Sequence, residues 1–164
     1  MIRIRNVLVA TDFSEPSMVA LDYGRELART YDAKLHILHV VEDLRWRYAT
    51  DMAPTALIDI QDDVEASARA RLDGLLADED RSQVRAHAAV VTAVSPSEAI
   101  VTFANAEAVD VIVMGTHGRN RLGRLFMGSV AERVVRLASC PVLTVRHPER
   151  EFIAPDALVA VAKA

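Results

Sequence analysis

Apolar residues in this chain of 164 residues form short continuous runs that alternate with longer stretches of helical spacing. The runs are rich in β-branched residues, which is typical of buried strands. Five runs predict five strands, at residues 7–10, 35–41, 88–94, 111–114 and 142–145. Because these strands are apolar at consecutive positions, both faces of the sheet must be covered, and the pattern predicts a parallel sheet between helices.

Two helices are predicted before the third run. The first has one apolar stripe at helical spacing, a candidate N-cap at Ser14 and Pro16 in its first turn. Its stripe comprises Ala20, Gly24, Leu27, Ala28 and Tyr31. The glycine on this stripe indicates close packing against the sheet. The second helix is expected from about residue 57 to 76. It follows a long connection at residues 42–56, and its apolar positions include Val64, Ala68 and Leu72.

Two further helices are predicted in the C-terminal half. The third begins at VSPSEAI, where Ser95 and Glu98 have the spacing of a capping box and Pro96 takes the first helical position. The fourth follows Gly128, and its expected buried face comprises Val130, Val134, Leu137 and Ala138. Strands and helices then alternate, with right-handed crossovers and two helices on each face. The predicted fold class is α/β, a Rossmann-like, doubly wound parallel sheet of five strands in the order 3-2-1-4-5.

The winding of such a sheet reverses between its first and fourth strands, and ligands bind beyond the carboxyl ends of the strands there. The first strand leads into Asp12, and the fourth runs from Met114 into MGTHGRNRLGRLFMGS, residues 114–129, which holds four of the chain's six glycines. Glycines gather where the backbone turns tightly or where a ligand approaches it. We therefore expect an anion such as phosphate to bind there. The residues expected to supply main-chain amides are Gly115, Thr116, His117, Gly118, Gly128 and Ser129.

Composition excludes several classes of protein. The length fits one domain, which we place at residues 1–147, followed by a loosely ordered tail at 148–164. The net charge of −4 argues against a nucleic-acid binder. The lone Cys140 cannot form an internal disulfide, and no apolar stretch approaches the roughly 18 residues that a membrane helix needs. The N-terminal apolar run breaks at Thr11, too early for a secretory signal, so we expect a cytoplasmic protein that does not enter membranes.

The glycine segment has the spacing Gly, two residues, Gly, nine residues, Gly-Ser, which is met by Gly115, Gly118, Gly128 and Ser129. Supporting stretches are VLVATDFSEPS, LHILHVV and GSVAERVVRLASCPVLTVR. With these stretches, the spacing resembles the ATP-binding branch of the universal stress protein family. The resemblance extends from Arg3 to about Arg146 and covers nearly the whole expected domain.

The resemblance implies an adenine-nucleotide site that takes ATP, with Mg²⁺ as a companion of the triphosphate. It implies that Asp12 lies near the ribose hydroxyls and that the main chain of Val40 and Val41 lies beside adenine. It implies that the glycine loop and Ser129 hold the phosphates. The other site residues that it carries over are Met114, His117, Arg119 and Val130. It also implies a homodimer through the last strand, with Val142, Thr144 and Arg146 near their symmetry mates.

Other nucleotide-binding motifs are absent from the sequence. No G-x-G-x-x-G follows the first run and no Gly-Lys-Ser or Gly-Lys-Thr occurs, which argues against an ordinary dinucleotide site and the usual phosphate loop. No residue has a convincing position for the group that orients the nucleophile in fast phosphoryl transfer. We therefore expect an ATP-binding regulator in stress adaptation and not an enzyme, with slow or no hydrolysis and an unidentified regulatory protein partner. The alternatives are an adenine-nucleotide hydrolase-type enzyme and a nucleotide-free dimeric scaffold.

Several side chains have two interpretations. Asp12 could cap the first helix, and His117 could equally be a turn residue or a neighbour of phosphate. Trp46 and Tyr48 could cover the nucleotide or merely anchor their loop. The arginines that could either screen phosphate charge or lie in solvent are Arg119, Arg121 and Arg124. Two histidines three apart on a strand should point to opposite faces and serve as packing residues, and these are His36 and His39.

Overall fold

The computed structural model describes residues 1–48, 53–76, 78–116 and 127–146. The expected tail at 148–164 lies outside these residues. The described helices and strands are, in chain order, β1 (Asn6–Ala10), α1 (Glu15–Tyr31), β2 (Lys34–Glu42), α2 (Leu44–Arg47), α3 (Pro54–Leu75), α4 (Asp78–Gln83), β3 (His87–Ala93), α5 (Pro96–Ala106), β4 (Val111–Gly115), α6 (Ser129–Leu137) and β5 (Val142–Val145).

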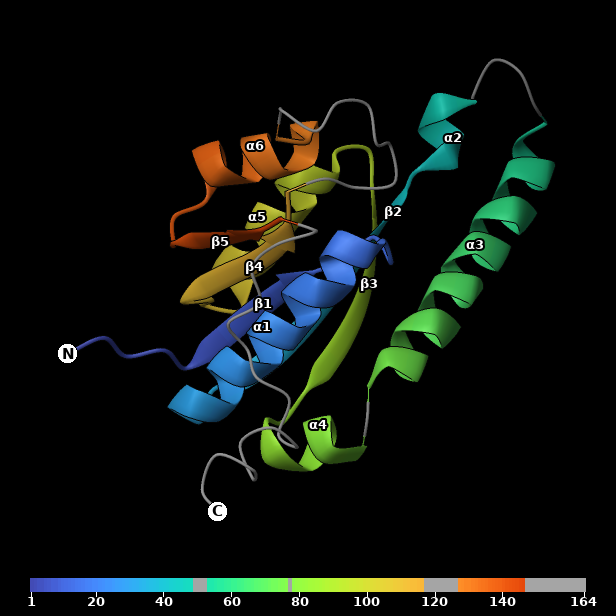
Figure 1. Ribbon diagram of the computed structural model, residues 1–164. Coiled ribbons are helices and arrows are strands. Elements are labelled where there is room, and N and C mark those ends of the chain that lie inside the picture. Colours follow the sequence, from blue (N-terminus) through green and yellow to red (C-terminus); the bar gives the residue numbers. More distant parts are fainter. Residues whose placement is uncertain (49–52, 77, 117–126, 147–164) are drawn as a thin grey trace.

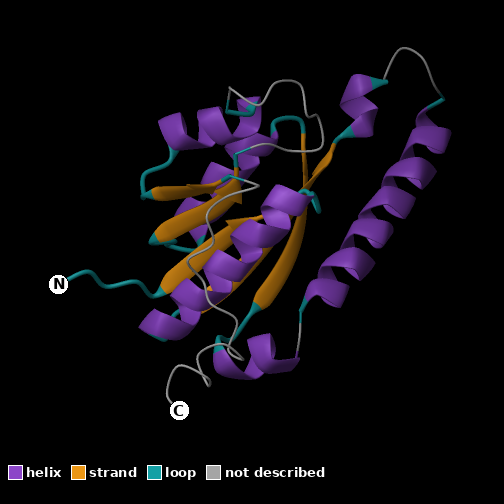
Figure 2. Ribbon diagram, in the orientation of Figure 1, coloured by secondary structure: helices purple, strands orange, loops and turns teal. Residues whose placement is uncertain are grey.

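The strands form one parallel sheet in the order β3-β2-β1-β4-β5, which confirms the predicted topology (Figure 1). Helices cover both of its faces (Figure 2). Val7 and Val9 of β1 belong to a core that includes residues of α1 and α3, whereas Leu8 and Ala10 belong to a second core with α5 and α6. The central strand β1 is therefore covered on both sides, as a parallel strand of consecutive apolar residues requires.

Helix α1 packs closely on β1 because Gly24 has no side chain. A Cβ atom built on Gly24 would overlap the Cγ2 atom of Val9, so the predicted close approach is confirmed. The predicted stripe is right except at its end, because Tyr31 is 39% exposed. Ser14 does occupy the N-cap position, but its side chain makes no capping bond and instead donates to Asp12.

Two details of α5 and α6 differ from the prediction. Pro96 does begin α5, but the capping box is wrong, because the Ser95 hydroxyl pairs with Ser97 and Glu98 forms an ion pair with Arg133. In α6 the buried residues are Ala131 and Val134, whereas two of the predicted core residues are exposed, and these are Val130 and Leu137. A nine-residue helix at the margin of the domain buries a narrower stripe than its sequence offers.

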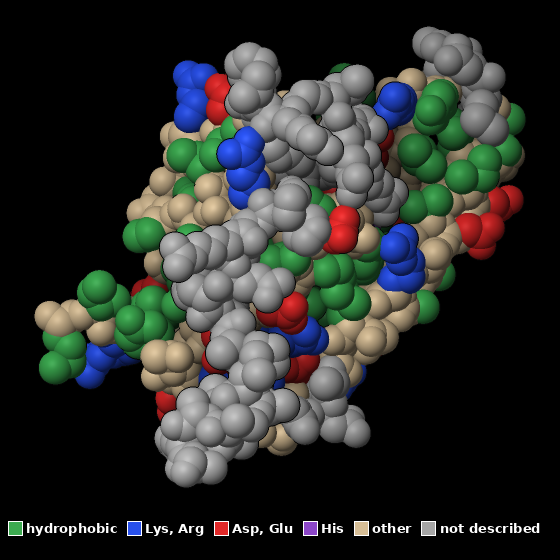
Figure 3. Space-filling view, in the orientation of Figure 1, with side chains coloured by type: hydrophobic (Ala, Val, Ile, Leu, Met, Phe, Trp, Pro, Cys, Tyr) green, Lys and Arg blue, Asp and Glu red, His purple; other side chains and the backbone are tan. Residues whose placement is uncertain are grey.

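The described part of the connection between β2 and β3 contains three helices. Helix α3 matches the predicted second helix, although Val64 is 40% exposed and does not join the core. The short helices α2 and α4 were not predicted, because four and six residues are too few to show a helical period. Figure 3 shows hydrophobic side chains gathered over α2 and the neighbouring end of α3. Trp46 of α2 is 74% exposed. Within the described part of the chain, no helix has the length and apolar character needed to cross a membrane.

Candidate functional site

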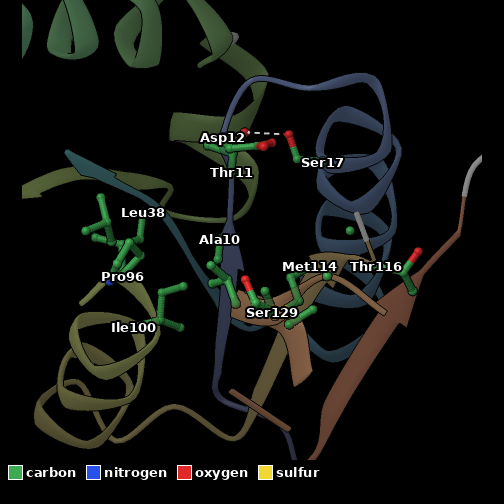
Figure 4. Close-up of a pocket in the computed structure, with 15 residues that line it drawn as sticks. Ala10, Thr11, Asp12, Ser17, Leu38, Pro96, Ile100, Met114, Thr116 and Ser129 are labelled. Carbon is green, nitrogen blue, oxygen red and sulfur yellow. Dashed lines mark hydrogen bonds between the residues drawn. The ribbon is translucent and has the colours of Figure 1, made fainter. Parts of the chain in front are cut away.

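A cavity of about 360 Å³ lies at the carboxyl ends of β1, β2 and β4 (Figure 4). It is at the reversal of strand order between β1 and β4, where ligands of doubly wound folds bind. Its volume falls within the range of roughly 300–1,000 Å³ that is usual for small-molecule sites. The lining residues are Ala10, Thr11, Asp12, Ser17, Leu38, Val40, Pro96, Ile100, Met114, Gly115, Thr116, Gly128, Ser129, Val130 and Ala131.

One side of the cavity is apolar. Leu38, Pro96 and Ile100 lie together on that side in Figure 4, and Val40 of β2 also belongs to the lining. Leu38 and Ile100 are almost completely buried and form part of the core between the sheet and α5. Because this wall belongs to the core, it offers a rigid surface on which a flat, weakly polar group such as a nucleobase can pack.

The polar side of the cavity begins at the loop between β1 and α1. Ser14 donates both its backbone N–H, at 3.1 Å, and its hydroxyl to Oδ1 of Asp12. The Ser17 hydroxyl donates to the Ser14 carbonyl at 2.8 Å and pairs with the Thr11 hydroxyl at 3.0 Å. Since Ser17 has already used its hydrogen, Thr11 is the donor in this pair. These bonds fix the Asp12 carboxylate at the edge of the cavity, where it can accept hydrogen bonds from sugar hydroxyls.

Phe13 gives this loop its shape. It has a backbone φ of 63°, in the left-handed region, and its N–H donates to the Thr11 hydroxyl at 3.0 Å. The Phe13 ring lies 4.4 Å from the His39 ring, and the guanidinium carbon of Arg71 lies 4.0 Å from the Phe13 ring centroid. The loop beside the cavity is thus in contact with both β2 and α3.

The remaining polar groups come from the end of β4 and the start of α6. The Gly128 N–H donates to the Thr116 carbonyl at 2.7 Å, so the two ends of the glycine segment are joined at the cavity. The first-turn N–H groups of a helix have no partner within the helix and carry a partial positive charge. Ser129, Val130 and Ala131 form the first turn of α6 and all line the cavity. This is a suitable environment for an anion.

Gly115 is required by the packing of α1 against the end of β4. A Cβ atom on Gly115 would lie 3.0 Å from the Cβ of Pro16 and 3.2 Å from the Ser17 nitrogen. Its lack of a side chain therefore lets the first turn of α1 approach the end of β4. This contact brings Ser17 to the cavity, and the glycine segment alone does not reveal it.

Most of the site residues expected from the sequence come together in the structure. Those that line the cavity are Asp12, Val40, Met114, Gly115, Gly128, Ser129 and Val130. Val41 is not in the lining, because its side chain is buried and neighbouring residues of a strand face opposite sides of the sheet. Three expected residues, His117, Gly118 and Arg119, lie outside the described residues, as do Arg121 and Arg124.

Other lining residues were missed by the sequence analysis as members of the site. Thr11 and Ser17 flank Asp12 in the chain, and their hydroxyls could have been recognised as a signal beside the switch point. Leu38, Pro96 and Ile100 look like ordinary core and helix-start residues in the sequence, and they reach the cavity only through the packing of α5 on β2. Neither Trp46 nor Tyr48 is among the lining residues.

The described lining of the cavity carries little charge. Among its described residues, Asp12 carries the single ionisable side chain. In the part of the chain that the structure describes, no group of three or more His, Cys, Asp or Glu residues could hold a metal ion. His36 and His39 point to opposite faces of the sheet, as predicted, with His36 against Phe103 of α5 and His39 against Phe13.

A doubly wound parallel sheet in the order β3-β2-β1-β4-β5, with a cavity at its switch point, defines an α/β domain of the Rossmann-like class. Within that class, the chain belongs to the universal stress protein family, whose sequence profile matches residues 3–146. The expected resemblance to this family is thereby confirmed.

Three known proteins show the extent of the similarity. A universal stress protein of Methanocaldococcus jannaschii is 32% identical over 159 residues, which cover 90% of this chain and 85% of that protein. A family member from Burkholderia pseudomallei has a crystal structure that is 31% identical with a TM-score of 0.66, covering 87% of this chain and 96% of that chain. A universal stress protein crystallised with cAMP is 25% identical with a TM-score of 0.56, covering 88% and 98%.

Proposed function

We propose that this chain binds an adenine nucleotide, with ATP as the favoured ligand, in the cavity at the carboxyl ends of β1 and β4. The observation that carries the proposal is the division of the cavity into an apolar wall and a polar side with Asp12 and the start of α6. A nucleotide has the same division, with a flat base at one end and phosphates at the other. The complex of a 25% identical family member with cAMP supports an adenine nucleotide.

Each part of the ligand has residues suited to it. Leu38, Val40 and Ile100 offer the base a dry surface, and Asp12 offers the ribose hydroxyls an acceptor. The N–H groups at Ser129 and Val130 offer phosphate oxygens donors in the first turn of a helix, where negative charge is favoured. Mg²⁺ is proposed as a companion of the triphosphate, bound chiefly by phosphate oxygens.

The biological role that we propose is a cytoplasmic regulator in stress adaptation, whose nucleotide occupancy controls its binding to a regulatory protein partner. Hydrolysis of ATP is proposed to be slow or absent, because no residue of the sequence has a convincing position for the group that orients the nucleophile. Fast phosphoryl transfer needs positive charge at the transferring group and a residue that orients the nucleophile. The alternatives are an adenine-nucleotide hydrolase-type enzyme and a nucleotide-free dimeric scaffold.

Ser129→Glu tests the binding site. Thermal unfolding of the wild type should shift upward with ATP, since a ligand at 100 times its Kd adds about 2.7 kcal/mol to stability. The new carboxylate would repel phosphate while remaining favourable to α6, because acidic residues stabilise the first turn of a helix. We therefore expect the variant to fold normally and to lose the shift with ATP.

The matched control is Thr102→Glu, which places the same charge at an exposed position within α5. This variant should keep the full shift with ATP. Binding of ATP by Ser129→Glu with unchanged affinity would show that the phosphate site is wrongly placed. A wild type that shifts with no adenine nucleotide would favour the scaffold, and repeated turnover of ATP would favour the hydrolase.

We also propose that the chain forms a homodimer through β5, from Val142 to Arg146. The support is that β5 is an edge strand of the described sheet and that Leu143 on it is 37% exposed. An uncovered edge strand presents unpaired N–H and C=O groups that another strand can satisfy. In a two-fold dimer the same residues of both copies meet.

A further inference from the structure

Phe13 has a backbone conformation that its side chain does not favour. Four non-glycine residues of the described chain have a positive φ, namely Phe13, Asp32, Arg85 and Ala108. Phe13 differs from the other three because the two residues that precede it, Thr11 and Asp12, line the cavity. A bulky residue in the left-handed region costs conformational energy and persists where its surroundings hold it.

Two side chains from distant parts of the sequence contact the Phe13 ring. His39 of β2 lies with its ring centroid 4.4 Å away and tilted by 42°. The guanidinium carbon of Arg71, on α3, is 4.0 Å from the ring centroid, which is well within the range of a cation–π interaction. Phe13 is half-buried and packs against the core beneath α1.

His39 also acts directly on the backbone of the loop. Its Nδ1 lies 2.8 Å from the Thr11 carbonyl oxygen, which can only accept, so Nδ1 carries the hydrogen and donates. The Phe13 N–H donates a hydrogen bond to the Thr11 hydroxyl. Asp12 therefore lies between Thr11, whose carbonyl is held by His39, and Phe13, whose ring contacts His39 and Arg71.

We propose that Phe13 and Arg71 are positioning residues of the nucleotide site, which hold Asp12 in place through the aromatic and cation–π contacts of the Phe13 ring. The inference rests on the proposed function and extends it, because it makes α3 part of the determinants of nucleotide affinity. Arg71 lies outside the cavity lining and acts through its contact with the Phe13 ring. Because binding free energies are linked, nucleotide binding should in turn favour the position of α3 in which Arg71 covers the ring.

The first experiment compares arginines on one helix. Arg71→Ala should weaken ATP binding by about 2- to 5-fold, the amount expected of one cation–π contact near the surface. Arg69→Ala is the matched control, because Arg69 lies on the same helix and pairs with Glu65 instead of Phe13. The control should leave the Kd unchanged, and Arg71→Lys, which retains the cation, should restore most of the affinity. Isothermal titration calorimetry measures all four proteins.

The second experiment tests the ring. Phe13→Ala should weaken ATP binding by more than Arg71→Ala, because it removes the contacts with His39 as well. Phe13→Tyr keeps the ring and should bind ATP like the wild type. In the double variant Phe13→Ala with Arg71→Ala, loss of the arginine should have no further effect, because its partner is already gone.

A spectroscopic readout is independent of ligand binding. The backbone amide of Ser14 is hydrogen-bonded to Asp12, so its signal in a ¹H–¹⁵N NMR spectrum reports the loop conformation. Arg71→Ala and Phe13→Ala should move this signal in the nucleotide-free protein, whereas Arg69→Ala should not. An unmoved Ser14 signal in both variants, or equal ATP affinity of Arg71→Ala and Arg69→Ala, would overturn the proposal. Failure of the wild type to bind ATP would overturn the proposed function instead, and the Ser14 signal would still decide whether the ring positions the loop.

Discussion

His36 is a buried histidine whose two ring nitrogens are poorly satisfied. Its side chain is 1% exposed, its Nδ1 has no hydrogen-bond partner among the residues that the structure describes, and its Nε2 is 3.5 Å from the Asn6 amide oxygen. Burial, reinforced by nearby Lys34, lowers the pKa of His36 from 6.5 to about 4, although Glu107 at 3.9 Å opposes this change. The neutral form of the ring is therefore the form that the folded protein accepts.

This lowered pKa predicts a pH-dependent stability. Between pH 6.5 and about 4 the unfolded chain binds a proton at His36 that the folded chain does not, so the free energy of unfolding falls as the pH falls. The slope from this residue should be roughly 1.4 kcal/mol per pH unit, for a total of about 3 kcal/mol. Urea denaturation of the wild type and of His36→Leu at pH 7, 6 and 5 measures the contribution, which should be absent from the variant.

The control for this prediction is His87→Gln, at an exposed histidine of the neighbouring strand. This variant should keep most of the pH dependence of the free energy of unfolding, because His87 is the smallest of the influences on the His36 pKa and burial is the largest. Parallel stability curves of the wild type and His36→Leu would show that His36 does not titrate as a buried group.

Helix α4 is attached to α1 by a buried ion pair. The side chain of Asp80 in α4 is 1% exposed, and its Oδ2 accepts hydrogen bonds from Nε and Nη2 of Arg25 at 3.1 and 2.9 Å. The same guanidinium donates to the carbonyl of Leu75, the last residue of α3, at 2.6 Å. Arg25 of α1 thus connects α3 and α4 to its own helix.

We predict that Arg25→Ala destabilises the protein by about 3 kcal/mol, because it leaves a buried carboxylate without its main cation. Asp80→Ala should cost less, since the Arg25 side chain is 19% exposed and its charge can reach water. Arg29→Ala is the control and should cost under about 1 kcal/mol, because the Arg29 side chain is 35% exposed and lies 3.9 Å from Asp80. Chemical denaturation at constant pH measures all three, and equal losses for Arg25→Ala and Arg29→Ala would contradict the prediction.

The strands could be predicted from the sequence more accurately than the buried faces of the helices, because the two patterns arise differently. All five strands were found to within two residues at each end, because a strand covered on both faces must be apolar at consecutive positions. The predicted buried face of α6 was wrong at Val130 and Leu137, which are exposed. A helix at the margin of the domain can carry apolar residues that do not pack into the core of its own chain. Ser95 does occupy the N-cap position of α5, but the capping box with Glu98 was wrong, because the Ser95 hydroxyl pairs with Ser97.

At the scale of the whole molecule, topology determined what could be predicted of the site. Asp12 and the end of β4 were expected to meet because the order of strands places their carboxyl ends together, and the structure agrees. The apolar side of the cavity formed by Pro96 and Ile100 could not be predicted, because it depends on how α5 packs against β2. The positive φ of Phe13 was equally hidden, since no glycine or asparagine marks that position.

The proposed dimer can be tested at one backbone N–H group of the edge strand β5, that of Thr144. The carbonyls of Pro141 and Val145 accept hydrogen bonds from β4 and from the residue that follows it, at 3.0 and 2.8 Å from the nitrogens of Ile112 and Thr116. Successive residues of a strand point their backbone groups to alternate sides, so the Thr144 N–H should face away from β4. Thr144→Pro removes this outward donor and leaves the pairing with β4 intact, since proline is tolerated where an edge N–H faces outward.

We predict that native mass spectrometry shows a dimer for the wild type and a monomer for Thr144→Pro at the same concentration. Thr144→Val keeps the N–H and a β-branched side chain, so it should remain dimeric. An unchanged circular dichroism spectrum and a retained thermal shift with ATP would show that Thr144→Pro is folded, because the cavity lies on the far side of β4 from this edge. A dimer that survives the proline would have to use another surface, and the exposed apolar residues of α6 would be the next to change.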